Sequence, residues 1–198
     1  AWLAALWLST APDAWALPAA RPCSAAELDE LTADATTPYR LTCRAVLNGT
    51  EVRRPVLLEG AEASGAGLDC GGGRIVAPGE ATTTRPTVAI WSRRDGAGWS
   101  RPVGVVVSDC VVVGNIRIWG MGAGGSMRDL LASSRTADHT TAAQSAAPLA
   151  TTLDRIRFEG VGTIPLYVGP GVTRTTVIRS RFRGRSTSVA LYLDAESA

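Results

Sequence analysis

A ten-residue pattern of apolar and polar positions occurs three times in the second half of the chain. It reads VVVGNIRIWG at 111–120, TTLDRIRFEG at 151–160 and TTVIRSRFRG at 175–184. The glycines that end these stretches are 40 and 24 residues apart. Self-similarity of this kind predicts one coil of 24 residues and one coil that carries an insertion of about 16 residues.

The second copy shows how each unit is built. Ile156 and Phe158 alternate with Arg157, which is the period-two pattern of a half-buried strand. Leu153 lies an odd number of residues from both apolar positions, so one straight strand cannot bury all three. We therefore predict two short strands joined by a sharp corner at 154–155. The equivalent corners are expected at 114–115 and 178–179.

A third strand follows in each coil. LYV at 166–168 and LYL at 191–193 are 25 residues apart, with aliphatic residues on one face and tyrosine on the other. Three short strands per coil predict a solenoid in which each strand pairs with its counterpart about 4.8 Å away in the next coil. Glycine and β-branched residues dominate, and this argues against a helical array. A β-sandwich is the alternative for the N-terminal part, where RPVLLEG and PTVAIWS match the repeat only weakly.

The combined pattern VVVSDCVVVGNIRIWG, TTLDRIRFEG, LYV, TTVIRSRFRG and LYL resembles the repeat of the pectin-lyase-like superfamily. GLDCGGGRIV resembles a first-coil motif of that group. The resemblance covers residues 52–198 and implies an all-β fold, a right-handed parallel β-helix with three strands and about 24 residues per coil. It does not specify an activity, because this fold carries lyases, hydrolases, epimerases and non-catalytic adhesins. The GHG and NTD signatures of its pectinases are absent.

The domain organisation follows from the ends of the repeat. Residues 1–16 are apolar and end in AWA at 14–16, which predicts the remnant of a secretory signal peptide; an apolar helix that caps the domain is the alternative. Residues 17–51 are expected to form an N-terminal cap. The β-helix then spans 52–198, with an inserted loop at 121–150, as the N-terminal part of a longer solenoid. We expect a secreted, periplasmic or cell-surface protein.

The four cysteines are consistent with an exported chain. Cys23 and Cys43 flank a short N-terminal segment and are the favoured disulfide. Cys70 aligns with core positions of the repeat and is predicted to be a buried free thiol. Cys110 lies just before another copy and is expected to be free for the same reason. No C-x-x-C pair or histidine cluster indicates a metal site.

Charge and composition limit the partners. Lys and Arg together number 20, all of them Arg, against 18 acidic residues, for a formal net charge of +2. We attribute the use of Arg alone to GC-rich coding, which indicates a bacterial source. A balance this close to neutral predicts no nucleic-acid partner, and no stretch is long and apolar enough to span a membrane. The sequence does not specify an oligomeric state.

Candidate chemistry gathers on the last strand. In the pectin-lyase-like group the strand before the first long turn forms the floor of the substrate groove, and here that strand is LYV or LYLDAES. If Leu191 and Leu193 face inward, Tyr192, Asp194 and Glu196 face outward together. Two carboxylates two residues apart lie about 7 Å from each other on a strand. Such a pair can bind Ca²⁺ or divide acid and base roles; a polar loop after the strand is the alternative.

The preceding coil supplies further candidates. Tyr167 matches Tyr192, and Gly169 matches Asp194, so open space is expected over the Gly169 backbone. Arg174 lies in the turn directly after LYV. There it can hold a uronate carboxylate, or act as the base, as the resemblance to pectate-lyase-like enzymes implies. A second set of arginines shares one repeat position and is expected to form a solvated or acid-paired ladder: Arg117, Arg157 and Arg181.

Two excursions from the repeat carry the last candidates. The inserted loop contains the single histidine, His139, in a stretch rich in Ala, Ser and Thr. The second excursion, WSRRDGAGWSRP at 91–102, contains Trp91 and Trp99, which can stack on sugar rings or cover the end of the solenoid. Together these residues predict a protein that binds or acts on polysaccharide, with an acidic polymer and lyase or hydrolase chemistry as candidates. A non-catalytic, adhesin-like solenoid is the alternative.

Overall fold

The computed structural model of the protein describes residues 19–82, 84–96, 98–122, 127–161, 164–185, 189–194 and 196–197. These residues form mostly parallel β-strands, with few helices. The expected signal segment at 1–16 lies outside the described residues. No helix in the described part of the chain combines the length and the apolar character needed to cross a membrane.

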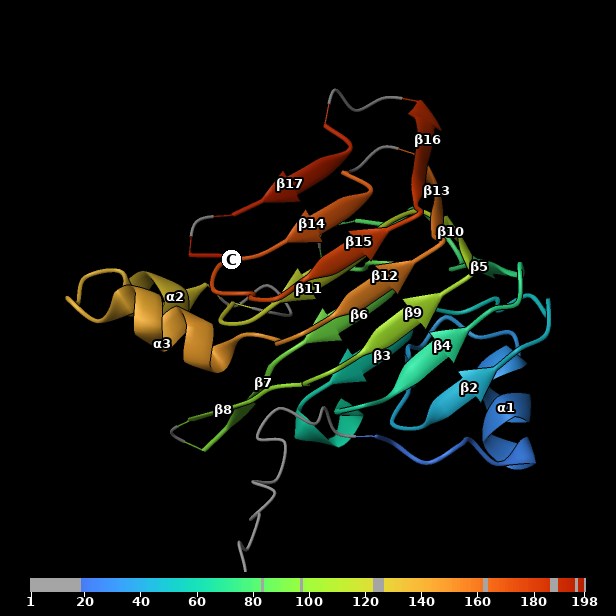
Figure 1. Cartoon of the computed structure of the whole chain (residues 1–198), viewed down its shortest axis with the longest axis horizontal. Helices are drawn as coiled ribbons and strands as arrows, with labels where there is room; N and C mark the ends of the chain where they lie inside the picture. Colours follow the sequence, from blue (N-terminus) through green and yellow to red (C-terminus); the bar gives the residue numbers. More distant parts are fainter. Residues whose placement is uncertain are drawn as a thin grey trace, which may run out of the picture.

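The parallel strands belong to three sheets, which we name sheet I, sheet II and sheet III (Figure 1). Sheet I contains β1 (Tyr39–Arg40), β3 (Val56–Glu59), β6 (Val88–Trp91), β11 (Ile116–Trp119), β14 (Leu166–Val168) and β17 (Leu191–Leu193). Sheet II contains β2 (Arg44–Val46), β4 (Gly67–Asp69), β9 (Val106–Ser108), β12 (Thr152–Asp154) and β15 (Thr176–Ile178). Sheet III contains β5 (Arg74–Val76), β10 (Val111–Val113), β13 (Arg157–Val161) and β16 (Arg181–Arg185).

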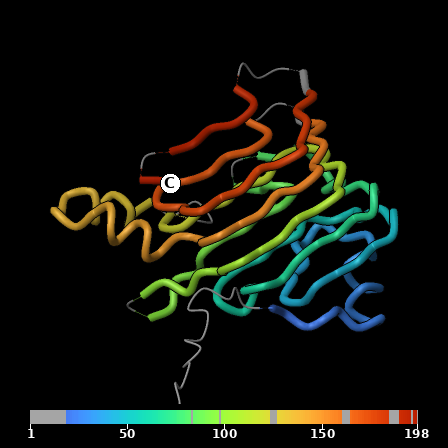
Figure 2. The backbone as a smooth tube through the Cα atoms, viewed as in Figure 1, coloured from blue at the N-terminus to red at the C-terminus, as the bar shows by residue number. Residues whose placement is uncertain are grey.

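The chain visits the three sheets in a repeating order. β9, β10 and β11 lie in sheets II, III and I, and both β12 to β14 and β15 to β17 repeat that order. We call one visit to sheets II, III and I in turn a pass. Successive passes lie on one another along the tube from blue to red (Figure 2). Each pass can therefore bury the apolar side chains of its neighbours, an arrangement that is compatible with a β-helix-like solenoid.

Two excursions leave the stack after strands of sheet I and lie on the same side of it (Figure 1). The first, after β6, is the antiparallel hairpin of β7 (Arg93–Asp95) and β8 (Gly98–Ser100). The second, after β11, contains helices α2 (Arg128–Ser133) and α3 (His139–Ala146). Helix α3 is close to the stack, because a Cβ atom on Gly120 would lie 2.7 Å from the Cα of Ala147.

Each pass turns from sheet II to sheet III at a residue with left-handed backbone. Arg155 and Arg179 both have a φ of 52°, which confirms the corners predicted at 154–155 and 178–179. Side chains on both sides of the corner are buried, as the alternation of apolar positions indicated. Phe158 lies within the core, and its ring stacks on that of Phe182 with centroids 4.6 Å apart.

The first copy of the repeat is in a different register from the predicted one. Val112 pairs with Phe158, whereas the repeat alignment had matched Phe158 with Ile118. The equivalent corner is therefore Asp109, with a φ of 52°, and the prediction of 114–115 is wrong. Apolar residues alternate with polar ones both in a strand of sheet III and in the next strand of sheet I. An alignment that matches a strand of sheet III to a strand of sheet I therefore still matches apolar with apolar positions, which is why the error was not visible in the sequence.

The N-terminal part also belongs to the parallel sheets. β3 and β6 pair in parallel within sheet I, so the β-sandwich alternative is wrong. β1 and β2 precede residue 52 and are already part of sheets I and II. The parallel sheets therefore begin within the segment that the sequence indicated as a cap.

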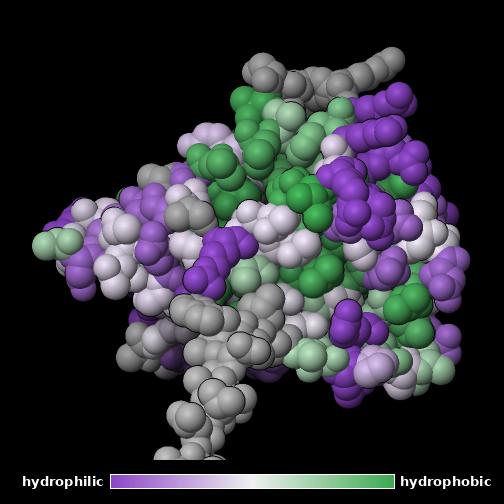
Figure 3. All heavy atoms as spheres, viewed as in Figure 1, coloured by the Kyte–Doolittle hydropathy of each residue, from purple (hydrophilic) through white to green (hydrophobic). Residues whose placement is uncertain are grey.

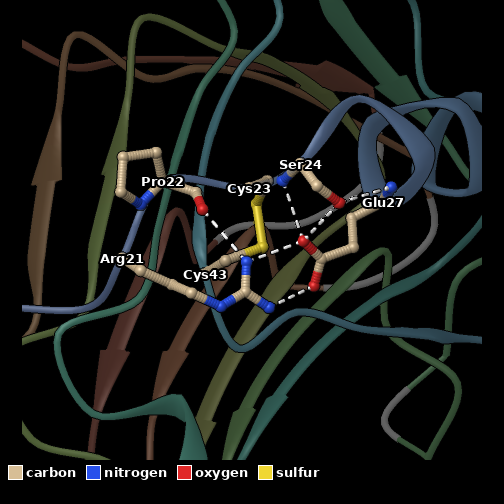
Figure 4. Close-up of a disulfide and its surroundings, with 6 residues drawn as sticks. All are labelled: Arg21, Pro22, Cys23, Ser24, Glu27 and Cys43. Atoms are coloured by element: carbon tan, nitrogen blue, oxygen red, sulfur yellow. Dashed lines mark hydrogen bonds and ion pairs between the residues drawn. A yellow bond between two sulfur atoms is a disulfide. The ribbon is translucent and has the colours of Figure 1, made fainter.

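Helix α1 (Ala25–Thr32) covers the N-terminal end of the stack with the buried side chain of Leu31. Its first turn has a capping box, in which Ser24 accepts from the backbone of Glu27 and Glu27 accepts from the backbone of Ser24. A hydrogen bond from Arg21 and these bonds from Ser24 lower the pKa of Glu27 to about 2. The Cys23–Cys43 disulfide, the favoured pair, lies beside this capping box (Figure 4).

A second disulfide joins Cys70 to Cys110, with Cα atoms 4.9 Å apart. The prediction that both are free thiols is wrong. Because Val111 pairs with Arg157, Cys110 occupies the inward position that Ile156 holds in the next pass. Cys70 and Cys110 thus meet inside the stack from neighbouring passes, and the shifted register explains why the repeat alignment separated them.

Candidate functional site

The outward face of sheet I carries a row of side chains from five neighbouring passes. Strand pairing puts the following residues in register: Leu57, Ala89, Arg117, Tyr167 and Tyr192. Trp91 and Trp119 pair in the adjacent row. We call these seven residues the sheet I face. Leu57, Ala89 and Trp91 pack together with Trp119 as a cluster separate from the main core, because they project away from it.

A cavity of about 290 Å³ lies at one end of the sheet I face. Leu57, Ala89 and Trp91 form part of its lining, and residues of the connection between β5 and β6 form another part. Glu80 and Arg85 bring polar groups to an otherwise largely apolar lining. A small cavity with apolar walls and a few polar groups is typical of a small-ligand site. The structure thus places Trp91, one of the predicted sugar-stacking residues, at a cavity.

The other end of the sheet I face is an aromatic platform. The rings of Tyr167 and Tyr192 stack with centroids 5.2 Å apart and an interplanar angle of 3°. Tyr192 is 41% exposed, and the hydroxyl of Tyr167 donates a hydrogen bond to the carboxylate of Asp194. Burial, together with that hydrogen bond, raises the pKa of Tyr167 above its ordinary value. Three predicted site residues therefore lie together here.

Arg117 lies between these two ends and is not part of an exposed arginine ladder. It pairs with Tyr167 in sheet I, whereas Arg157 pairs with Arg181 in sheet III, so the prediction of one shared position is wrong. Its side chain is 2% exposed, and its Cζ atom lies 5.0 Å from the centroid of the Tyr167 ring. Burial lowers its pKa. The cation–π contact offsets part of the cost of burying this charge.

The sheet I face contains buried donors that have no acceptor. Arg117 Nε has no hydrogen-bond partner, and the same holds for the indole Nε1 atoms of Trp91 and Trp119. Within the described residues, no carboxylate forms an ion pair with Arg117. Orphaned donors of this kind are rare in native structures and call for an explanation. The middle of the sheet I face therefore has a positive charge and unused hydrogen-bonding capacity.

Trp119 fills the space that Gly169 was expected to leave open. A Cβ atom on Gly169 would lie 2.8 Å from Cδ1 of Trp119, so glycine is needed there to admit the indole. The Trp119 ring centroid also lies 5.4 Å from that of Tyr167. The predicted gap over the backbone is wrong, because an aromatic side chain from the preceding pass occupies it.

Glu196 does not share the strand face of Asp194. β17 ends at Leu193, and Glu196 has a left-handed φ of 60°, so alternation along the strand no longer sets its direction. Its Oε1 atom lies 3.6 Å from Nε2 of His139 at the start of α3. His139 and Glu196 therefore contact each other, although the sequence did not connect them. The prediction that Asp194 and Glu196 form a carboxylate pair on one strand face is wrong.

The His139–Glu196 contact is part of a clasp between the helical excursion and the end of the last strand. Nδ1 of His139 lies 2.8 Å from the hydroxyl oxygen of Ser133, and that hydroxyl donates to the carbonyl of Leu130 within α2. Nε2 of Gln144 donates to the carbonyl of Glu196 at 3.1 Å. These bonds join α2, α3 and the segment after β17, so His139 has a positioning role for the fold.

Calcium does not fit the predicted acid pair. Ca²⁺ takes six to eight oxygen ligands, whereas Asp194 accepts from Tyr167 and Glu196 faces His139. The described residues contain no group of three or more His, Cys, Asp or Glu side chains that could hold a metal ion.

The remaining predicted residues lie away from the sheet I face. Arg174 is exposed, with a φ of 56°, at the corner between β14 and β15. Trp99 on β8 packs against a cluster of Met121, Leu130 and Ala146, and Arg94 Cζ lies 5.6 Å from its ring centroid. Trp99 therefore packs against the helical excursion, and neither sugar stacking nor covering the end of the solenoid follows from this contact.

From the sequence, Arg117 is predicted only as a member of an arginine ladder, and Trp119 is not named as a candidate. The signal for both was present in IRIW, since Ile116 and Ile118 alternate with Arg117 and Trp119 at period two. The parity places Arg117 and Trp119 outward on the same strand. Assigning this strand to the wrong sheet hid their relation to Tyr167.

A comparison with known proteins found no family model, no curated protein and no solved structure that matches this chain.

Proposed function

We propose that the protein is an exported, right-handed parallel β-helix of the pectin-lyase-like type whose sheet I face binds polysaccharide. The repeating order of three parallel sheets supports the fold. Two disulfides suit an oxidising compartment and so support export. Glycan binding rests on the sheet I face itself.

One observation carries the proposal: the platform of Tyr167 and Tyr192 lies in the same row of sheet I as Leu57 and Ala89, which line the cavity. An exposed, rigid aromatic ring offers an apolar surface to the C–H face of a sugar, and stacking holds it at low entropic cost. Asp194 beside the platform offers a carboxylate to hydroxyl groups. A chain lying across the strands would contact several passes, as an extended polymer does.

The buried charge of Arg117 favours an acidic sugar. A carboxylate bound over this region would compensate a guanidinium that lacks an ion-pair partner among the described residues. We therefore expect polyuronates to bind more tightly than neutral glucans of the same length.

Titration calorimetry with polygalacturonate, alginate and neutral dextran tests this function. Tyr192→Ala should weaken binding of the preferred glycan about fivefold to 100-fold, since a stacking contact on an aromatic side chain is worth on the order of 1–3 kcal/mol. Leu131→Ala is the control, because it removes a 58% exposed apolar side chain from α2. Equal affinities for wild type and Tyr192→Ala would refute a sheet I binding site.

Catalysis is a separate hypothesis with its own assay. If Asp194, Glu196 and Arg174 perform elimination on a polyuronate, ultraviolet absorbance from new C=C bonds will rise with wild type and stay flat with Asp194→Ala. We expect no rise, because the two carboxylates contact different partners, Tyr167 and His139. A rise that Asp194→Ala abolishes would establish a lyase instead of a binding protein.

A non-catalytic structural solenoid is the second candidate. It is favoured by the same two contacts, which occupy both carboxylates within the protein. A glycan array with no binding by wild type, at concentrations where a control lectin binds, would favour this function over glycan recognition.

A further inference from the structure

A second charged surface lies on sheet III, away from the sheet I face. Its first component is the corner between sheets II and III. Arg155 and Arg179 hold this corner in neighbouring passes with the same φ of 52°, so their side chains leave the stack in the same direction. Both are exposed, and both contact the carboxylate of Asp154 from the strand before the corner.

The second component is a row on the first position of β13 and β16. Arg157 and Arg181 are directly paired in register and are exposed. Neighbouring parallel strands lie about 4.8 Å apart, so the two guanidinium groups leave the backbone at that spacing. Like charges directly opposite each other on a sheet repel and destabilise it.

These four arginines line one open depression of about 260 Å³, together with Asp109 and apolar residues between them. In the space-filling view, hydrophilic side chains gather over the area of β13 and β16 (Figure 3). The depression is thus an arginine-lined surface feature. We call it the arginine depression.

The acids near the arginine depression neutralise the corner arginines only. Asp154 accepts from Arg155 at 2.7 Å and from Arg179 at 2.6 and 2.8 Å, and Asp109 lies 3.9 Å from Arg155. Within the described part of the chain, no carboxylate lies at ion-pair distance from Arg157 or Arg181.

Another acid near this row is already used. Glu159 on β13 pairs with Arg74 at 3.1 Å. Four arginines against Asp109 and Asp154 leave two positive charges in the arginine depression. The whole chain has a formal net charge of only +2, so this local excess does not reflect a generally basic protein.

We infer that the arginine depression binds an oxoanion group, a sulfate ester or a carboxylate, of an acidic polysaccharide. Guanidinium groups donate two parallel hydrogen bonds to such anions, and two of them one strand apart can hold one anion between them. The bound anion would also remove the repulsion between Arg157 and Arg181. The repeat of the solenoid presents these charges along the stack, in the direction of an extended polymer.

The lining favours a glycan over single-stranded nucleic acid. Proteins that bind single strands combine a positive groove with aromatic side chains on which bases stack. The described lining of the arginine depression has no Trp, Tyr or Phe. The inference is independent of the sheet I face, since it involves another sheet and other residues.

Binding of dextran sulfate, polygalacturonate and neutral dextran tests the inference, at about 50 and 200 mM salt. Wild type should bind one or both acidic polymers, more weakly at the higher salt concentration, and any binding of dextran should not depend on Arg157 or Arg181. In the Tyr192→Ala background, which lacks the sheet I site, Arg157→Gln with Arg181→Gln should lower the affinity for the acidic polymer about 100-fold, taking about tenfold per charge-assisted contact. The acidic polymer that responds identifies the anion as sulfate or carboxylate.

The control variant carries Arg44→Gln and Arg135→Gln, two exposed arginines outside the arginine depression. It has the same net charge as the test variant and should bind within about threefold of wild type. An equal loss in both variants would show general charge attraction and overturn the site. A test variant that binds like wild type would overturn it as well.

Two further measurements distinguish this inference from glycan binding at the sheet I face and from binding of nucleic acid. Tyr192→Ala should keep the arginine-dependent binding of dextran sulfate, so loss of the sheet I site leaves the arginine depression testable. A single-stranded oligonucleotide that binds more tightly than both acidic glycans, with the same dependence on Arg157 and Arg181, would identify nucleic acid as the partner and refute the inference. Circular dichroism and thermal melting of each variant verify its fold.

Discussion

Breaking the Cys70–Cys110 disulfide tests the register of the passes most directly, because those cysteines meet only if Val111 lies beside Arg74. The bond closes a loop with a sequence separation of 40. Loop-closure entropy for that length corresponds to about 4 kcal/mol of stability at 25 °C. The Cys23–Cys43 bond, with a separation of 20, corresponds to about 3 kcal/mol.

The assay uses two variants, each of which retains one of the two disulfides. In Cys23→Ala with Cys43→Ala, reduction opens only Cys70–Cys110, and the oxidised and reduced forms compared have the same buried side chains. Urea unfolding of its oxidised and reduced forms should differ by about 4 kcal/mol in the free energy of unfolding. The reciprocal variant, Cys70→Ala with Cys110→Ala, should lose about 3 kcal/mol on reduction.

Peptide mapping provides the covalent control. Arginines separate the four cysteines along the chain, so trypsin places each on a different peptide. Non-reduced digests should yield the two pairs that the structure contains. Free thiols at Cys70 and Cys110 in the oxidised, folded protein would refute the register, and so would identical unfolding of the oxidised and reduced forms of the first variant.

Two further predictions concern the core and the N-terminal cap. Phe158→Ala, which removes a buried ring from the stack with Phe182, should cost about 3–5 kcal/mol of unfolding free energy in urea titrations, and a cost below about 1 kcal/mol would contradict the packed interior. Because the folded-state pKa of Glu27 is lowered to about 2, its carboxylate stabilises the fold above the ordinary value of 4.5 and less as pH falls toward 2. The melting temperature of Glu27→Gln should therefore lie below that of wild type at pH 7, and the gap should close in acid. A gap that widens in acid would show the opposite sign of linkage.

Local patterns in the sequence determined the repeating unit correctly. The alternation around Arg157 and the odd spacing of Leu153 predicted two strands and a corner, and the structure has the left-handed residue Arg155 there. The repeated LYV and LYL predicted neighbouring strands, and Tyr167 pairs with Tyr192. These features depend on a few adjacent residues and on a spacing of 24 residues that no insertion interrupts. The alternation of apolar positions was therefore sufficient to predict them.

The candidate site was predictable only where the strand itself continued. Tyr192 and Tyr167 lie on strands, and they share the outward face as expected. Glu196 lies beyond the end of β17, where a left-handed residue changes direction and alternation no longer applies. Its partner His139 comes from an excursion whose position on the stack no local pattern specifies.

Tertiary structure alone decided the register across the interrupted coils. Strands of sheets I, II and III have the same period of two, so the sequence cannot distinguish a strand of sheet III from the next strand of sheet I once an insertion hides the spacing. The position of one strand, β11, determined whether Arg117 was an exposed ladder residue or a buried cation under Tyr167. The same register brought Cys70 to Cys110. Local alternation of apolar and polar residues was therefore enough to predict the repeating unit, whereas the contacts between side chains of different passes depend on long-range strand pairing.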